Sequence, residues 1–395
     1  MKKTVTVGTV LTIISSAVSY ITQVIVTEIA GFSARGQIEV ITSIIALASA
    51  IFSYNSYTAL TLYARKYKGE PVNSKNVFNI TTATQMLGAM LILYFSFDSF
   101  NGGGGLLIIL IIAVAVVINN YANFNLALLN GLEKFIPSKV ANSTGQMLAL
   151  ISIIILVRFA NPSIETLVYC ASFLPLVYIG ICSGRLKSYY FVPQVKVIFS
   201  LKRAFLDLWP VYIISIAQLA ATRLFIIYVS YTTTLDKIGS FAFANSLIQL
   251  GLFPMSMAAT VIISKRKNTT TQKHKIILFA IYLLICIFGY GLIDSEILGL
   301  IPLQSFRSLN FIGDAKILIW TLPFNAIVMI VIAEAVSKQR FSNVLIITQC
   351  AMLPIAVVVY EICEMISKSN SVALAFSIAT LVVSFVTLGD KRNVS

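Results

Sequence analysis

Charged residues are scarce in this sequence, and their scarcity excludes an ordinary soluble protein. Asp, Glu, Lys and Arg make up 11% of the 395 residues, against about 25% in soluble domains. Hydrophobic residues make up 58%, and the mean hydropathy is +0.89. Apolar runs of membrane-spanning length recur from end to end, and a soluble fold could not bury all of them. The composition therefore predicts a membrane protein with many spans.

Histidine and cysteine are also rare, which excludes several kinds of catalytic and metal site. The single histidine, His274, lies in the basic loop "SKRKNTTTQKHK", so a histidine-based catalytic triad is excluded. The five cysteines fall in apolar runs without zinc-like spacing and are interpreted as small buried residues. The stretch "NGGGG" at 101–105 lacks the Lys-Ser/Thr ending of a phosphate-binding loop and is interpreted as an outside turn. We therefore expect neither an enzyme nor a cofactor.

Twelve apolar segments are long enough to span a bilayer as helices. Helices satisfy their own backbone hydrogen bonds, which lipid cannot do for an open strand. The expected spans are residues 5–30, 38–62, 77–97, 105–130, 140–157, 164–182, 205–230, 238–263, 276–293, 317–336, 343–366 and 371–388. The first is interpreted as an uncleaved span rather than a signal peptide, because its apolar stretch continues to Ala30.

The 29 basic residues are distributed unevenly across these spans. If the connections alternate from an inside start, Arg223 lies within a span, 22 basic residues lie inside, and 6 lie outside. The outside residues are Arg35, Arg158, Lys237, Arg307, Lys316 and Lys368. This bias follows the positive-inside rule and predicts that both termini are cytoplasmic. It also explains the net charge of +14 without nucleic acid as a partner.

The longest inside connection divides the chain near its midpoint. Residues 1–183 are expected to form an N-terminal lobe, 184–204 a cytoplasmic connection, and 205–395 a C-terminal lobe. The halves share weak features, including Gly36 and Gly239 near the starts of the second and eighth spans. Chance similarity between apolar helices is the alternative to a repeat. We expect an all-α polytopic membrane protein of two six-helix lobes, as in several transporters.

Polar side chains form stripes inside three of the expected spans. At 100° per residue, each stripe keeps to one helix face. The candidate binding residues on these stripes are Tyr20 and Gln23 in span one, Asn119 and Asn123 in span four, and Asn245 and Gln249 in span eight. Hydrogen bonds between helices, at about 0.6 kcal/mol each, would explain any single residue. Three stripes together favour a shared polar cavity.

A family resemblance is carried by three stretches, "GFSARGQIEVITSIIALASAIFSYNSYTALTLYARK", "LALLNGLEKFIPSKVANSTGQ" and "LDKIGSFAFANSLIQLGLFPMSMAATVIISKRK". Together with the twelve expected spans, they resemble the Wzx-type polysaccharide flippases of the multidrug/oligosaccharidyl-lipid/polysaccharide (MOP) exporter superfamily. The likeness covers nearly the whole chain. Two positions depart from the family pattern: Asn55 stands where Gly is common, and Thr222-Arg223 stands where Asp-Arg is common.

The resemblance implies both a fold and a function. The lobes would enclose a central cavity, and the protein would move undecaprenyl-diphosphate-linked oligosaccharide repeat units across the bacterial cytoplasmic (inner) membrane by alternating access. The sugars would cross in the cavity while the lipid tail stays in the bilayer. The product would be O-antigen or another surface polysaccharide, with a polysaccharide polymerase and a chain-length regulator as candidate partners.

Arg223 is the basic residue that lies within an expected span. It follows Trp209 by about 21 Å of helix, which places it in the outer half of a hydrocarbon core about 30 Å thick. Snorkelling to the interface, or a structural pair with Asp236 or Glu28, would explain it without a functional role. However, the forked donors of Arg suit phosphate oxygens. We therefore predict that Arg223 faces the cavity and helps to hold the diphosphate.

Two other functions are weighed against this interpretation. A drug or cation exporter of the same superfamily would need a carboxylate in the cavity. Glu28 and Glu334 are the candidates for that carboxylate and for ion coupling. An O-antigen polymerase, which is a membrane glycosyltransferase, usually carries a large outside loop with functional arginines. The longest outside loop here, 294–316, has Arg307 as its single arginine.

Overall fold

Helices form almost all of the described structure, which is a computed structural model. It describes residues 2–53, 56–58, 60–61, 72–73, 75–96, 105–132, 134–190, 197–198, 201–252, 254–256, 258–259, 262, 272–294, 303–338, 342–366 and 370–389. Asn55, residues 101–104 of the expected outside turn and the basic segment 263–271 lie outside these ranges. His274, expected in a loop, follows the start of a helix at Gln272.

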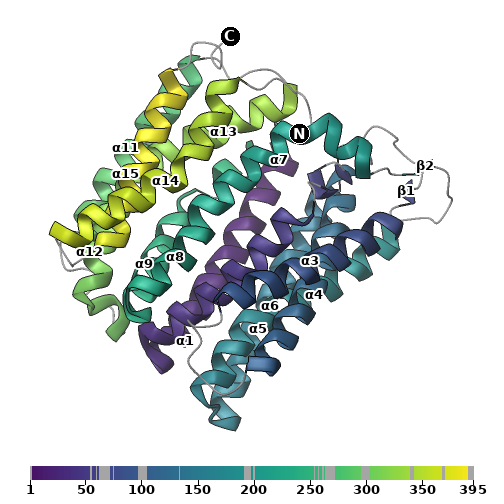
Figure 1. Cartoon of the computed structure of the whole chain (residues 1–395), viewed down its shortest axis with the longest axis horizontal. Helices are drawn as coiled ribbons and strands as arrows, with labels where there is room; N and C mark the ends of the chain where they lie inside the picture. Colours follow the sequence, from purple (N-terminus) through teal and green to yellow (C-terminus); the bar gives the residue numbers. More distant parts are fainter. Residues whose placement is uncertain are drawn as a thin grey trace. The chain divides into compact units, whose positions relative to one another are not determined.

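One compact unit consists of Met1–Thr22 and Val40–Leu219. Its helices are the two ends of α1 (Lys2–Ile51), α3 (Lys75–Ser96), α4 (Gly105–Gly131), α5 (Phe135–Ala160), α6 (Ile164–Tyr190) and α7 (Leu201–Leu219). Helices α5 and α6 lie side by side, and α6 also packs along α4 (Figure 1). A short parallel pair joins β1 (Val72–Asn73) to β2 (Val197–Ile198).

The second compact unit consists of Gln23–Glu39 and Ala220–Ser395. Besides the middle of α1, it contains η2 (Ala220–Leu224), α8 (Phe225–Thr232), α9 (Leu235–Leu250), α11 (Gln272–Asp294), η4 (Gln304–Arg307), α12 (Leu309–Leu318), η5 (Ile319–Thr321), α13 (Leu322–Lys338), α14 (Asn343–Ile366) and α15 (Ser371–Gly389). Helix α14 packs along α15, and α12 packs along α9.

The expected lobe bounds differ from these units in two places. Residues 23–39 group with the second unit, and residues 205–219 group with the first. Within the expected connection, 184–204, α6 continues to Tyr190 and α7 begins at Leu201. The bounds of the two lobes stay a prediction. A hydropathy profile detects the apolar part of a helix. It does not detect polar residues at the helix end.

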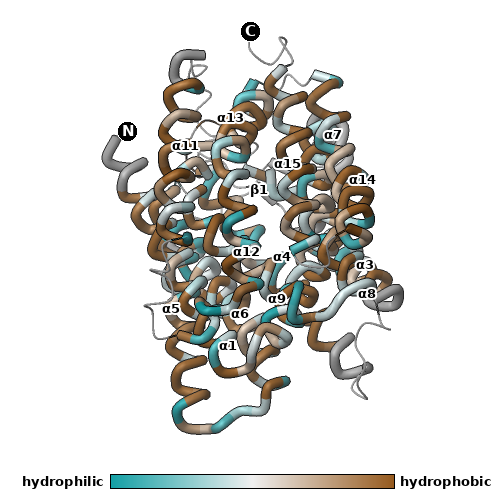
Figure 2. Tube along the Cα trace, turned by 90° about the vertical axis from the view of Figure 1, so that its left-hand side faces the viewer, coloured by the Kyte–Doolittle hydropathy of each residue, from teal (hydrophilic) through white to brown (hydrophobic). Residues whose placement is uncertain are grey.

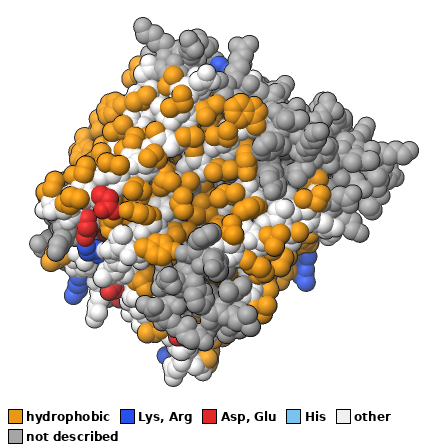
Figure 3. Space-filling view, in the orientation of Figure 1, with side chains coloured by type: hydrophobic (Ala, Val, Ile, Leu, Met, Phe, Trp, Pro, Cys, Tyr) orange, Lys and Arg blue, Asp and Glu red, His pale blue; other side chains and the backbone are white. Residues whose placement is uncertain are grey.

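The described helices have the composition of membrane spans. Within the described residues, nine helical segments are long and apolar enough to cross a bilayer. One of them, Val7–Ile51, covers most of the first two expected spans, and the apolar part of α3, Val77–Ile92, is shorter. Hydrophobic residues follow most of the helical trace (Figure 2) and dominate the face shown in Figure 3. The all-α polytopic membrane fold is confirmed, and the count of twelve spans stays a prediction.

Gly31 divides α1 into the first two expected spans. Its backbone angles, φ 79° and ψ 177°, lie outside the helical region, and positive φ is readily adopted only by glycine. The second helix continues directly from this glycine, so Arg35 is not a solvated loop residue as its place in the outside set implied. Arg35 is only 2% exposed.

Two glycines let the second part of α1 approach α9. A Cβ atom on Gly36 would collide with the carbonyl oxygen of Leu235, and one on Gly239 would collide with the carbonyl oxygen of Phe32. Phe32 also packs edge-on against Phe243, with ring centroids 6.0 Å apart. The two glycines that occupy like places in the sequence halves therefore form one close helix contact, of the kind that small residues permit in membranes.

Replacing Gly239 with alanine is expected to destabilise the protein by about 1–3 kcal/mol, because the added methyl group must displace the backbone of α1. Gly291→Ala is the matched control: Gly291 lies on α11 with open space around its Cβ position. Thermal unfolding of the purified variants in detergent measures both effects. Equal unfolding temperatures for Gly239→Ala and Gly291→Ala would show that the contact is not tight.

Candidate functional site

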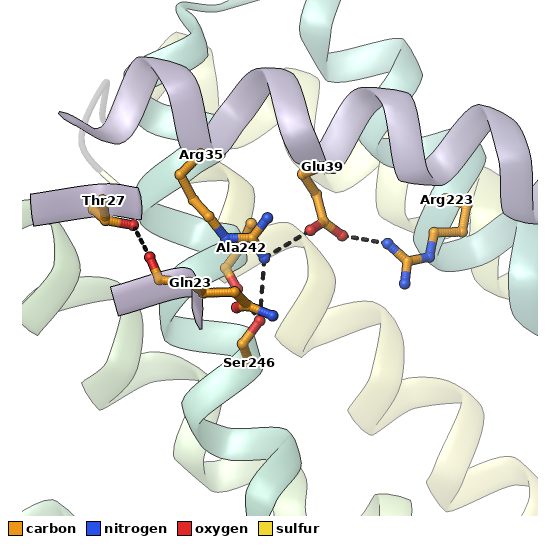
Figure 4. Close-up of polar contacts among 7 residues, drawn as sticks. All are labelled: Gln23, Thr27, Arg35, Glu39, Arg223, Ala242 and Ser246. Atoms are coloured by element: carbon orange, nitrogen blue, oxygen red, sulfur yellow. Dashed lines mark hydrogen bonds and ion pairs between the residues drawn. The ribbon is translucent and has the colours of Figure 1, made fainter. Parts of the chain in front are cut away.

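A cluster of charged side chains lies within the second unit, and we call it the arginine cluster. It consists of Arg35 and Glu39 on α1, Arg223 on η2 and Ser246 on α9 (Figure 4). These residues come from three segments of the chain, and Glu39 and Arg223 are 184 positions apart. The fold therefore assembles a group that no local pattern contains.

Glu39 lies at the centre of the arginine cluster. Its Oε2 pairs with Arg35 Nη2 at 2.8 Å, and its Oε1 accepts a hydrogen bond from Arg223 Nη1. Arg35 Nη2 also donates to Ser246 Oγ at 3.3 Å. Figure 4 shows the two guanidinium groups on opposite sides of the carboxylate. This arrangement neutralises one of the two positive charges and leaves the other.

Burial differs strongly within the arginine cluster. The Arg35 side chain is 3% exposed and that of Glu39 is 11% exposed, whereas the Arg223 side chain is 31% exposed. A buried ion pair is maintained only when its geometry is good, because both charges lose their hydration. Arg223 is the member that can still reach a ligand. The cluster thus has one net positive charge and presents a partly exposed guanidinium, which suits an anion.

The backbone at Arg223 is itself unusual. Residues Ala220–Leu224 form a π-helical turn between α7 and α8. Such turns insert an extra residue, rotate the side chains that follow, and are frequent at functional sites. The regular 100° spacing of side chains around a helix therefore does not hold through Arg223.

The partner of Arg223 was not among those considered from the sequence. Asp236 and Glu28 were the candidate carboxylates, and the structure pairs Arg223 with Glu39 instead. Glu28 accepts hydrogen bonds from the backbone N–H groups of Gln304 (3.0 Å) and Ser305 (2.6 Å). Glu28 thereby accepts the hydrogen bonds of two backbone N–H groups at the start of η4. The one sequence signal that pointed to the arginine cluster was the four-residue spacing of Arg35 and Glu39, which is typical of an ion pair on a helix.

The other predicted site residues divide between the two units. Tyr20, Asn119 and Asn123 belong to the first unit, and Gln23, Asn245 and Gln249 to the second. All six are partly exposed within the structure. Their assignment to substrate binding stays a prediction.

The structure brings some of these residues together inside the first unit. Asn123 Nδ2 donates to Asn119 Oδ1 at 3.1 Å, and Asn119 Nδ2 donates to Ser49 Oγ at 2.7 Å. The Asn119–Ser49 bond joins two helices, as the alternative of hydrogen bonding between helices expects, whereas the Asn123–Asn119 bond lies within α4. Partial exposure leaves each of them able to contact a ligand as well.

A second polar network in the first unit lies deeper and was not part of the predicted stripes. Asn120 is fully buried, accepts a hydrogen bond from Tyr57 (2.7 Å) and donates one to Thr82 (2.6 Å). Gln85, also fully buried, donates to Tyr57 at 3.0 Å. These hydrogen bonds involve side chains of α3 and α4, and none of them involves a charged group. Asn120 lies off the stripe of Asn119 and Asn123 because it faces α3.

Glu334 is ion-paired, which bears on its candidacy for ion coupling. Its Oε2 lies 2.8 Å from Lys275 Nζ, and both side chains are largely buried. The pair joins α13 to the start of α11. Whether Glu334 or Glu28 couples an ion to transport stays a prediction.

Comparison with known proteins gives a match at the level of structure. No family model and no curated protein matches the sequence. The solved structure of the lipid II flippase MurJ in an inward closed conformation matches 98% of this chain and 87% of its own, with 14% identity and a TM-score of 0.71. A MATE structure in complex with MaD3S matches 99% and 96%, with 16% identity and a TM-score of 0.69. A MOP superfamily transporter from Pyrococcus furiosus matches 99% and 96%, with 15% identity and a TM-score of 0.64.

The chain has the fold of the MOP superfamily transporters. Each match covers nearly the full length of this chain, so the shared fold includes the residues of both compact units. Sequence identities of 14–16% establish the fold alone. The expected resemblance is therefore confirmed at this level, and the proteins matched are transporters rather than enzymes.

Proposed function

We propose that this protein is a flippase for undecaprenyl-diphosphate-linked oligosaccharide repeat units, used in the synthesis of O-antigen or another surface polysaccharide. The repeat unit would cross by alternating access. The proposal rests on the Wzx-like sequence stretches, on the transporter fold and, above all, on the arginine cluster.

The arginine cluster carries the proposal because its chemistry matches the invariant part of such a cargo. Every repeat unit, whatever its sugars, is attached through a diphosphate. Arg223 offers guanidinium donors to phosphate oxygens, and Glu39 with Arg35 holds it in place. Half-buried amides such as Asn119 and Gln249 can donate to and accept from sugar hydroxyls.

The same observation disfavours a drug or cation exporter, although the fold is shared with MATE transporters. A cationic cargo would need an unpaired carboxylate to meet it. In the arginine cluster the most exposed group is a cation, and Glu39 already pairs with two arginines. A polymerase is disfavoured because the matched folds belong to transporters.

The proposed setting follows from the charge bias and the cargo. The protein would lie in the bacterial cytoplasmic (inner) membrane with both termini in the cytoplasm. Its partners would be the lipid-linked oligosaccharide and the bilayer, with a polysaccharide polymerase and a chain-length regulator acting on the product.

Complementation of a strain that lacks its own Wzx-type flippase tests the proposal. The strain would make one defined repeat unit, and restored surface polysaccharide is the expected result. Resistance to cationic dyes, measured in an efflux-deficient strain, serves as the test of the alternative. Dye resistance without restored polysaccharide, across repeat units with neutral and acidic sugars, would overturn the flippase proposal in favour of an exporter.

A further inference from the structure

Two charged and two aromatic side chains lie together at one end of the second unit, and we call them the rim cluster. Lys316 Nζ on α12 lies 2.6 Å from Asp294 Oδ1 at the end of α11, and 6.0 Å from the centroid of the Tyr290 ring. The ring centroids of Tyr290 on α11 and Trp320 on η5 are 5.8 Å apart. Asp294 and Lys316 are the first and last residues of the expected outside loop, 294–316, so the positive-inside rule predicts that the rim cluster lies at the outer surface of the membrane.

The backbone of η5 directs Trp320 to the surface beside α11. Gly289 lets α11 and η5 approach closely, since a Cβ atom there would lie 2.5 Å from Ile319 Cδ1. The Cys286 thiol on α11 also donates to the carbonyl oxygen of Ile319 at 3.0 Å. Ile319 and Thr321 are buried, whereas Trp320 between them is exposed. A short 3₁₀ turn thus presents one large aromatic ring at the surface, next to the end of α11.

The ion pair of the rim cluster keeps unused binding capacity. The side chain of Asp294 is 59% exposed and that of Lys316 is 30% exposed, so both can reach a ligand. A lysine ammonium has three donors, and Asp294 Oδ1 takes one of them. Asp294 Oδ2 has no hydrogen-bond partner in the part of the chain that the structure describes. The pair can therefore donate to an anion and, at the same time, accept from a cation.

An exposed apolar face of α11 leads to the rim cluster. At 100° per residue, one stripe of this helix contains Leu284, Ile287, Gly291 and Asp294. Leu284 and Ile287 are exposed, as expected of side chains that face lipid, and Gly291 has open space around its Cβ position. From Leu284 to Asp294 is about 15 Å of helix, or half of a hydrocarbon core about 30 Å thick. A lipid that lies along this face therefore has its acyl chains on apolar side chains and its headgroup beside the ion pair.

The charges of the rim cluster discriminate between lipid headgroups. Asp294 and Lys316 together carry no net charge, which matches a headgroup that is itself zwitterionic. An anionic headgroup would gain from Lys316 but would meet the exposed carboxylate of Asp294 at close range. A primary ammonium can donate an N–H to Asp294 Oδ2, whereas a quaternary ammonium has no N–H to donate. Either ammonium can lie over the rings of Tyr290 and Trp320.

We propose that the rim cluster binds the headgroup of a zwitterionic phospholipid with a primary ammonium, of the phosphatidylethanolamine class. Lys316 donates to the phosphate oxygens, and Asp294 Oδ2 accepts from the ammonium group, which the rings of Tyr290 and Trp320 also attract. Four charges of alternating sign then form one network that joins α11 to α12. The site shares no residue with the arginine cluster, so the bound lipid is a resident of the outer leaflet and not the cargo.

The fluorescence of Trp320 in a bilayer tests this proposal, because Trp209 is the only other tryptophan of the chain. The Trp209→Phe variant, in vesicles of phosphatidylcholine, is titrated with a phosphatidylethanolamine that carries bromine on its acyl chains, or with the matching brominated phosphatidylcholine. Bromine quenches a tryptophan that it contacts. The ethanolamine lipid should reach half-maximal quenching at about a two- to tenfold lower mole fraction, as expected of an exposed ion-pair and cation–π site.

Three substitutions in the Trp209→Phe background locate the headgroup. Asp294→Asn should make the two lipids quench equally, because the amide has no charge to hold the ammonium group. Lys316→Arg should keep the preference, since a cation that donates to phosphate remains. Glu165→Gln is the matched control for Asp294→Asn: it neutralises another exposed acid, at the start of α6 in the first unit, and should leave the preference unchanged.

The alternative to a lipid site is that Tyr290 and Trp320 are ordinary aromatic residues of the membrane interface. Equal quenching by the two lipids in the Trp209→Phe variant would establish that alternative and overturn the proposal. A preference that survives Asp294→Asn would also overturn it, since the headgroup would then not contact the carboxylate. Stronger quenching by a brominated phosphatidylglycerol than by the ethanolamine lipid would assign Lys316 to an anionic lipid instead.

Discussion

Replacing Arg223 with alanine is expected to abolish transport of a diphosphate-linked cargo while the protein stays folded. The variant loses the most exposed guanidinium of the arginine cluster. The remaining charges of the cluster are balanced, because Glu39 keeps its pair with Arg35 at 2.8 Å. No buried charge is left uncompensated, so membrane levels should remain normal. The loss of one hydrogen-bonding contact to a charged group lowers the affinity for the diphosphate by about 10- to 100-fold.

A series of substitutions at Arg223 separates charge from geometry. Arg223→Lys should keep partial activity, because the charge remains while the fork of donors is lost. Arg223→Glu should be inactive, since it places a second carboxylate beside Glu39. Surface polysaccharide in the complemented strain and quantified protein in the membrane are the two measurements.

The matched control for this series is Arg307→Ala. Arg307 is exposed on η4 in the same unit and should tolerate the change. Normal polysaccharide from Arg223→Ala would show that Arg223 serves only as the structural partner of Glu39. Its role in binding the diphosphate would then be wrong.

Hydropathy predicted the membrane helices well because lipid permits little else. A backbone in hydrocarbon must bond to itself, so a long apolar run such as 343–366 has one available structure, and α14 covers the same residues. Helix ends were harder to predict. The sixth expected span ended at residue 182, whereas α6 continues to Tyr190 through the polar stretch "SGRLKSYY", which hydropathy does not register.

The arginine cluster could be predicted only in part. Arg35 and Glu39 are four residues apart, which is the spacing of a helical ion pair, but Arg35 was assigned to a loop because charge is not expected in a span. Its burial depends on Glu39 and on contacts with α9. The pairing of Glu39 with Arg223 joins positions that are distant in sequence, and no periodicity reports such a contact.

Two further features lie beyond single-sequence patterns for different reasons. The π-helical turn at Ala220–Leu224 contains no Gly or Pro, so its residues do not indicate a break in the regular helix. Asp314 lies in a segment that was expected to be a solvated outside loop, where an acid is ordinary. It becomes unusual only because α12 starts at Leu309 and buries it against α9.

Replacing Glu39 with alanine is expected to cause the largest loss of stability. The change leaves Arg35, whose side chain is 3% exposed, without its carboxylate partner. Breaking a buried ion pair from one side typically costs about 3–5 kcal/mol, which is a large part of the roughly 5–15 kcal/mol that holds a typical protein folded. We expect a lower unfolding temperature in detergent and less protein in the membrane.

A double substitution tests whether the unpaired charge is the cause. Arg35→Met combined with Glu39→Leu removes both buried charges and keeps similar volume, an exchange that is often neutral or stabilising. Arg223 can stay hydrated in this variant because its side chain is 31% exposed. The double variant should therefore recover most of the stability that Glu39→Ala loses. Equal losses in the single and double variants would instead attribute the effect to packing between α1 and α9, and wild-type stability in Glu39→Ala would show that the ion pair does not stabilise the fold.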